Sequence, residues 1–131
     1  MIIGIGTDIV EISRFINLLK KSTRESLKKI FTNNELEYVF SKKLVSQQAG
    51  ILAKRYAAKE AFAKAIGTGV RQKIILNQIE IVNDDLGKPG IVLHKSTKEY
   101  TEKLFTKNIS FHVSLSDEKK FAIAFVTIEK F

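Results

Sequence analysis

Two carboxylates and one lysine lie where the surrounding sequence is apolar, and these residue types can do chemistry. Asp8 follows two glycines in the apolar segment IIGIGTDIV, and Glu60 interrupts the alanine-rich segment RYAAKEAFAKA. Lys64 follows Glu60 by four residues, which places both on one face of a helix. Two carboxylates, completed by phosphate oxygens and waters, form a ligand set typical of Mg²⁺. The residue types therefore suggest metal-assisted chemistry on a phosphate.

The same residues also have ordinary structural explanations. Glu60 and Lys64 are spaced for an i,i+4 ion pair, which stabilises an exposed helix by about 0.2 to 0.5 kcal/mol. Such a pair is expected in a polar sector, whereas alanines and large apolar residues surround it here. A desolvated carboxylate is costly unless it is paired or bound to a cation. Asp8 could simply cap a turn. Sequence spacing does not show whether Asp8 meets Glu60, so both explanations stay open.

Composition limits the class of protein. The chain has 131 residues, 44% of them hydrophobic, which predicts a single domain over residues 1–131 with its own core. A net charge of +8 favours an acidic partner: nucleic acid, anionic lipid, a phosphate substrate or an acidic protein. The absence of cysteine excludes disulfides and thiolate metal sites. No basic leader segment and no membrane-length apolar run are present, so we expect a cytoplasmic protein without a membrane partner.

Short strands and helices alternate along the chain. Hydrophobic periodicity and capping residues predict most of their limits. In the first half we expect a strand over 2–10, helices over 13–21 and about 22–31, a third helix capped by Thr32 or Asn33, and a long helix over 45–66 closed by Gly67. In the second half we expect two hairpins, around the turns DDLGKP and DEKK, separated by a helix over 96–105.

The strand NISFHVSLS shows which side of the sheet is buried. Its apolar residues alternate with serines and a histidine, so that one face is apolar and the other polar. The fold class predicted is α+β, with an antiparallel β-sheet and helices packed on one side.

Five motifs together resemble a known family. GIGTDIVEISRF, FTNNELEY, LAKRYAAKEAFAKAIGTG, GKP and HVSLSD occur in the order, and at roughly the spacings, of the bacterial holo-acyl-carrier-protein synthases. These are small 4′-phosphopantetheinyl transferases, and the resemblance covers nearly the whole chain. It implies Mg²⁺-dependent transfer of 4′-phosphopantetheine from coenzyme A to a serine of apo acyl carrier protein, releasing adenosine 3′,5′-bisphosphate, in fatty acid biosynthesis. It also implies a homotrimer with active sites at the subunit interfaces.

The resemblance implies roles for individual residues. Asp8 and Glu60 match the metal ligands of the family, and Lys64 matches a lysine that would stabilise the pyrophosphate electrostatically. The base that deprotonates the acceptor serine stays open between Glu60, a metal-bound water and a carboxylate of the carrier protein. The positions expected to bind coenzyme A are Arg55, Lys59, Lys64, Gly67, Gly69, His112 and Ser114.

Several of these positions have simpler explanations. Arg55 and Lys59 could extend from packed stems to solvent, and Gly67 and Gly69 could simply end the helix. His112 could be an ordinary strand histidine. Asp117, in the segment SLSD, replaces a histidine often found in the family, which weakens any role for that loop.

The basic residues of the first helices also match a family contact. The acidic carrier protein would meet them through complementary charge, which chiefly raises the association rate. Without the resemblance, they are the solvated face of amphipathic helices. The residues expected to bind the carrier protein are Arg14, Lys21, Arg24 and Lys28.

Two alternative functions fit part of the sequence. A small basic nucleic-acid-binding module would explain the charge, but no nucleic-acid motif is present and the polar strand face carries serines in place of stacking aromatics. It would also leave Asp8 and Glu60 unexplained. A Mg²⁺-dependent phosphohydrolase would use the same two acids.

Overall fold

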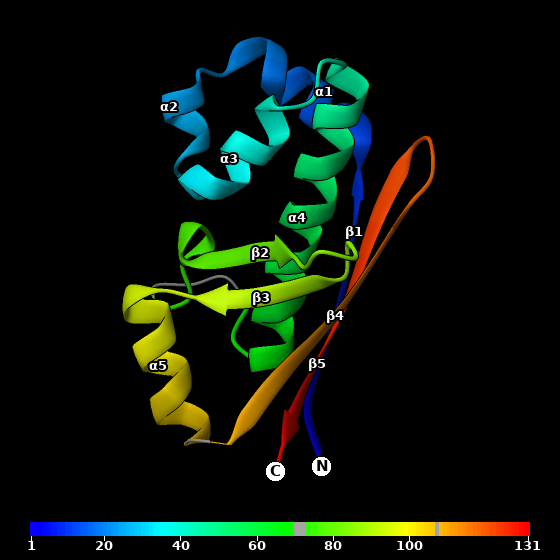
Figure 1. Ribbon diagram of the computed structural model, residues 1–131. Helices are drawn as coiled ribbons and strands as arrows, with labels where there is room; N and C mark the ends of the chain where they lie inside the picture. The colour runs from blue at the N-terminus through cyan, green and yellow to red at the C-terminus, as the bar shows by residue number, and fades with distance from the viewer. Residues whose placement is uncertain (70–72, 107) are drawn as a thin grey trace.

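The computed structural model describes residues 1–69, 73–106 and 108–131 (Figure 1). Along the chain its elements are β1 (Ile2–Glu11), α1 (Ile12–Lys21), α2 (Arg24–Leu27), α3 (Asn33–Phe40), α4 (Val45–Ile66), the 3₁₀ helix η1 (Leu76–Gln78), β2 (Ile79–Asn83), β3 (Pro89–Leu93), α5 (Lys95–Phe105), β4 (Ile109–Asp117) and β5 (Phe121–Lys130).

The long helix α4 is the centre of the molecule. On one side it packs on an antiparallel sheet of order β1-β5-β4, and on the other it meets the antiparallel pair β2-β3 (Figure 1). Helices α1, α2 and α3 gather near one end of α4, α5 lies toward the other, and the two termini are neighbours. The predicted α+β class is confirmed, although the strands form two sheets.

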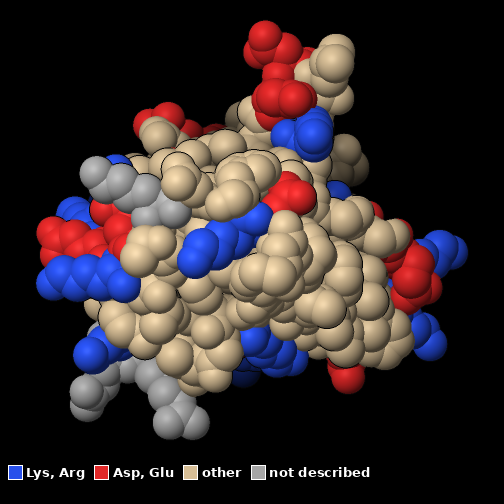
Figure 2. All heavy atoms as spheres, turned by 90° about the horizontal axis from the view of Figure 1, so that it is seen from below, with Lys and Arg blue, Asp and Glu red and all other residues tan. Residues whose placement is uncertain are grey.

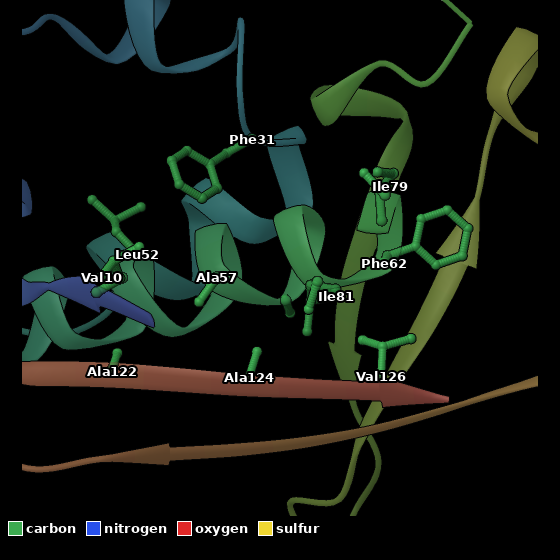
Figure 3. Packing of buried hydrophobic residues seen from close by; sticks show 14 of the residues in the cluster. Val10, Phe31, Leu52, Ala57, Phe62, Ile79, Ile81, Ala122, Ala124 and Val126 are labelled. Carbon is green, nitrogen blue, oxygen red and sulfur yellow. The ribbon is translucent and has the colours of Figure 1, made fainter. Parts of the chain in front are cut away.

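Small side chains let α4 pack closely on both sides. The alanines of β5 that face α4 are fully buried, as are the alanines of α4 that meet them. Figure 3 shows this packing, with apolar side chains of α4 between β5 on one side and the β2 region on the other. The labelled members of the cluster are Val10, Phe31, Leu52, Ala57, Phe62, Ile79, Ile81, Ala122, Ala124 and Val126.

The limits of α4 match the prediction, and Gly67 closes the helix in the left-handed conformation. Helix α2 is shorter than the expected helix over about 22–31 and begins two residues later. Thr23 caps it, because the Thr23 hydroxyl accepts from the Ser26 amide, whereas the Ser22 amide instead bonds to Leu18 at the end of α1. Ser22 and Glu25 have the spacing of a capping box, and a helix start at Ser22 predicted from that spacing is wrong.

Strand register decides which side chains face α4. Asp8 pairs with Ala124, whose side chain is buried against α4, so Asp8 points to the helix side. His112 pairs with Thr127 and lies on the outer face, as the predicted alternation requires. The sheet thus separates Asp8 from His112 within one chain.

Charge is mixed on the end of the molecule shown in Figure 2. Lysines, arginines and acidic side chains are interspersed around a largely uncharged centre. None of the helices in residues 1–69, 73–106 and 108–131 combines the length and apolar character needed to cross a bilayer.

Candidate active site

Two glycines of β1 allow the strand to lie directly on α4. A Cβ atom at Gly6 would stand 1.8 Å from the Ala61 carbonyl oxygen, and one at Gly4 would stand 2.3 Å from the Ala65 carbonyl oxygen. Only glycine therefore fits this backbone contact. The next residue on the same face of β1 is Asp8, so this close packing holds Asp8 against α4, where the Lys64 ammonium reaches it.

Asp8 meets α4 at Lys64. The Lys64 ammonium donates to Asp8 Oδ1 at 3.0 Å and to the Thr7 carbonyl oxygen at 3.0 Å. The Asp8 side chain is 16% exposed, whereas that of Lys64 is 53% exposed. Helical spacing suggested a pair between Lys64 and Glu60, but the structure pairs Lys64 with Asp8. Glu60 precedes Lys64 by one turn of α4, so Lys64 connects Asp8 to the part of the helix that carries Glu60.

Glu60 is half-buried and lies near Tyr56, a tyrosine that sequence reasoning missed. Arg14 Nη2 donates to the Tyr56 hydroxyl at 3.4 Å, and the Glu60 carboxylate lies close enough to influence the pKa of that hydroxyl. Burial raises the pKa of Tyr56; the hydrogen bond from Arg14 opposes this shift and the Glu60 carboxylate adds to it. Tyr56 precedes Glu60 by one helical turn, and this i,i+4 spacing was the available signal. The contact also connects Arg14 of α1 to the site.

Asp8 and Glu60 suit a magnesium ion that shares its ligands with a substrate. Both are carboxylates, and they come from two elements held together by the backbone contact at Gly6. Among the residues that the structure describes, no three acidic or histidine side chains gather closely enough to hold a metal by themselves. Mg²⁺ commonly uses one or two carboxylates together with phosphate oxygens and water. Lys64 adds a positive charge for the same phosphates.

A basic cleft of about 500 Å³ opens between α4, α3 and the β2-β3 hairpin. The Arg55 guanidinium lies 4.7 Å from the centre of the Tyr38 ring. Burial lowers the pKa of Arg55, and the neighbouring Glu35 carboxylate offsets part of this shift. Residues that line the cleft include Tyr38, Lys54, Arg55, Asn83, Lys88 and Ser114. Two of the predicted coenzyme A contacts, Arg55 and Ser114, are thus brought together here.

Lys59 does not reach this cleft. Its side chain has no exposed surface, and its ammonium bonds to Glu35 at 2.7 Å inside the protein. Burial lowers the pKa of Lys59, and the Glu35 carboxylate offsets only part of this shift. A lysine without exposed surface is unable to contact coenzyme A in this conformation, so we correct that prediction: the structure makes Lys59 part of a buried ion pair.

Three further predicted coenzyme A positions, His112, Gly67 and Gly69, are not among the residues that line the basic cleft. His112 is exposed on the outer face of the sheet, where its Nε2 contacts Glu129 Oε1 at 3.2 Å. Gly67 and Gly69 have φ angles of 98° and 66°, and their amides bond to the last carbonyl groups of α4. In this structure the two glycines end the helix.

The basic residues of α1 and α2 have different surroundings. Lys21 and Arg24 are exposed, whereas Lys28 already pairs with Glu25 at 2.7 Å. Arg14 lies over the Tyr56 ring at 5.0 Å, which ties it to the Glu60 site. Asp117 is 3.6 Å from Lys54 at the rim of the basic cleft.

Comparisons with known proteins agree on one family. The model of the 4′-phosphopantetheinyl transferase superfamily matches residues 4–126. The chain is 44% identical to a holo-[acyl-carrier-protein] synthase of Yersinia enterocolitica, over 98% of each chain. A crystal structure of holo-[acyl-carrier-protein] synthase from Neisseria meningitidis superposes with a TM-score of 0.86 at 40% identity, covering 99% of this chain and 100% of that one. A holo-(acyl-carrier-protein) synthase from Bacillus anthracis in complex with CoA (3′,5′-ADP) has a TM-score of 0.82 at 34% identity, covering 100% and 99%.

Proposed function

Because the chain belongs to the 4′-phosphopantetheinyl transferase superfamily, we propose that it works as a holo-[acyl-carrier-protein] synthase. It transfers the 4′-phosphopantetheine group of coenzyme A to a serine of apo acyl carrier protein. The products are holo acyl carrier protein and adenosine 3′,5′-bisphosphate. The structural observation that supports this assignment is the contact between Asp8 and Lys64, which follows Glu60 by one helical turn.

Asp8 and Glu60 would hold Mg²⁺ against the coenzyme A pyrophosphate. When bound, the ion neutralises charge on the phosphoryl oxygens and on the leaving group. Lys64 is free to turn from Asp8 toward the pyrophosphate because its side chain is half exposed. Its ammonium then stabilises the same negative charge. The serine oxygen bonds to phosphorus as the bond to adenosine 3′,5′-bisphosphate breaks, and Glu60 is one candidate acceptor of the serine proton.

The basic cleft is our proposed site for the nucleotide end of coenzyme A. Arg55, Lys54 and Lys88 supply cations for its phosphates, and the partly apolar walls suit a base. Support comes from the Bacillus anthracis relative, whose structure contains CoA (3′,5′-ADP). Ser114 lines the same cleft.

The carrier protein would dock beside this site through α1 and α2. Exposed Lys21 and Arg24 offer charge to an acidic partner. Arg14 bonds to Tyr56, which precedes Glu60 by one turn of α4, and so connects α1 to the helix that carries Glu60. It therefore stands between the docking surface and the reacting groups.

The outer face of the β1-β5-β4 sheet supports assembly as a homotrimer. Ile5 and Ile9 are 61% and 60% exposed there, beside exposed Ile123 and Phe125. An apolar patch of this kind marks an interaction surface. His112 lies on the same face, so assembly through it would place His112 at the subunit interface.

The remaining proposals concern organisation and setting. Residues 1–131 would form one phosphopantetheinyl transferase domain, since one buried cluster joins α4 to both sheets. The reaction would serve fatty acid biosynthesis in the cytoplasm. The comparisons support neither the nucleic-acid-binding module nor the phosphohydrolase.

Intact mass spectrometry of the carrier protein tests this function. Apo acyl carrier protein is incubated with the protein, coenzyme A and Mg²⁺. We expect the mass of one phosphopantetheinyl group to be added, and no addition when Mg²⁺ is chelated. Hydrolysis of coenzyme A without any carrier adduct would instead support the phosphohydrolase. Absence of the adduct, with a carrier protein that another transferase modifies, would contradict the proposal.

A further inference from the structure

The buried pair of Lys59 and Glu35 needs an explanation, because neither side chain has any exposed surface. Taking two charges out of water costs several kcal/mol per ion, and an apolar pair of similar size is often as stable or more so. Stability alone therefore does not account for the pair. The arrangement of its hydrogen bonds points to another role.

The pair joins three segments of the chain. Lys59 Nζ, on α4, donates to Glu35 Oε1 at 2.7 Å, to the Leu76 carbonyl oxygen at 3.0 Å and to the Ile79 carbonyl oxygen. All three protons of the ammonium group are used. The pair therefore links α4 to α3 and to the start of β2.

Glu35 fastens the same segments from the other side. Its Oε1 also accepts from the Thr32 amide at 2.9 Å, and its Oε2 accepts from the Ile81 amide at 3.1 Å. Apolar contacts have no preferred direction, whereas these hydrogen bonds define one relative position of the segments. An apolar pair would allow α3 and β2 to shift along α4.

The segments joined in this way are those that build the basic cleft. Tyr38 follows Glu35 by one turn of α3, and Arg55 precedes Lys59 by one turn of α4, so both pairs of residues share a helix face. Tyr38 and Arg55 stack at the cleft. The hairpin that begins with β2 brings Lys88 to the same cleft. The contact buried in the core and the stacked contact at the cleft thus belong to one interface between α3 and α4.

We propose that Lys59 and Glu35 are positioning residues that fix the wall of the coenzyme A cleft, acting through Tyr38, Arg55 and the β2-β3 hairpin. This inference rests on the proposed function, since it takes coenzyme A to be the occupant of the cleft. On this proposal the pair determines the affinity for coenzyme A. Removing the pair would leave the catalytic groups on β1 and the last turns of α4 in place.

The variant Glu35→Gln tests the proposal in the full-length protein. It preserves side-chain shape but removes the charge that Lys59 faces. The dissociation constant for coenzyme A, measured by calorimetry, and the KM for coenzyme A should each rise at least about tenfold. We expect kcat at saturating coenzyme A to stay within about threefold of the wild type, because the catalytic groups do not move. Faster hydrogen exchange at the Ile81 amide should accompany these changes.

The matched control is Ile128→Ala, which truncates a fully buried side chain of β5. Ile128 lies four residues along the strand from Ala124, the residue that pairs with Asp8. It should lower the melting temperature and leave coenzyme A affinity within about twofold. If Glu35→Gln does not fold, the double variant Glu35→Gln with Lys59→Met, which leaves no unpaired buried charge, takes its place.

Each outcome decides the inference. Unchanged coenzyme A affinity in the Glu35 variant, or an equal loss in Ile128→Ala at equal stability, would overturn it, as would a wild-type protein that does not bind coenzyme A. A wild-type protein that binds coenzyme A but adds nothing to apo acyl carrier protein would contradict the proposed function alone. In that case the affinity and exchange results still decide the role of the pair.

Discussion

Replacing Gly6 by alanine should separate the two halves of the active site. The added Cβ atom would stand 1.8 Å from the Ala61 carbonyl oxygen, where real Cβ contacts essentially never fall below 3.0 Å. The obstacle is helix backbone, so β1 and α4 must move apart by about 1.2 Å or more. Misplacement by about 1 Å can cost roughly 100-fold in rate. We expect a loss of this order in pantetheinyl transfer, because Asp8 moves away from Glu60 and Lys64.

Stability should change less than activity. Overpacking costs about 1 to 3 kcal/mol, and each kcal/mol lowers Tm by about 4 °C in a protein of this size. Carrier modification followed by mass spectrometry gives the rate, and thermal unfolding gives Tm. Gly90→Ala is the control, since its Cβ atom would meet Val82 Cγ2 at an ordinary 3.6 Å. If Gly6→Ala transfers pantetheine at the wild-type rate, the strand-on-helix contact does not position the site.

Two further predictions concern charge. The double variant Lys21→Glu with Arg24→Glu should raise the KM for acyl carrier protein and weaken the salt dependence of this KM, while coenzyme A affinity stays unchanged. Equal kinetics with acyl carrier protein in mutant and wild type would show that these residues are not part of the docking surface. Burial would raise the pKa of Glu80, but hydrogen bonds from Thr32 and His94 hold it below the ordinary value of 4.5. Glu80 therefore stabilises the fold above pH 4.5 and loses this contribution as pH falls through its lower folded pKa. Thr32→Val should weaken the fall of Tm at acid pH, because it removes the hydrogen bond from the Thr32 hydroxyl to Glu80. An unchanged dependence of Tm on pH would contradict this role of the hydrogen bond.

Local patterns predicted much of the fold. The limits of α4 followed from its apolar run and from Gly67, and the two faces of β4 followed from simple alternation. Thr32 was predicted as a cap, and its hydroxyl accepts from the Glu35 amide. These features depend on residues close together in sequence. The α+β class followed from the order of the elements.

Contacts between distant segments were beyond the sequence patterns. An ion pair of Lys64 with Glu60 was one of two open interpretations, because helical spacing shows only neighbours on the same helix. In the structure the partner of Lys64 is Asp8, which comes from another element. Lys59 was assigned to coenzyme A because it lies within the motif that resembles the family, whereas in the structure it pairs with Glu35, 24 residues away. No spacing within α4 reveals that partner.

Glu60→Gln tests the central claim most directly. Glutamine keeps the size and shape of the glutamate side chain, so the fold should persist while one ligand charge for Mg²⁺ is lost. The measurement is the mass of apo acyl carrier protein after incubation with coenzyme A, Mg²⁺ and either wild type or mutant. We predict a phosphopantetheinyl adduct from the wild type and at least about a 100-fold slower reaction from a folded mutant. A wild-type rate of adduct formation by Glu60→Gln would contradict the account.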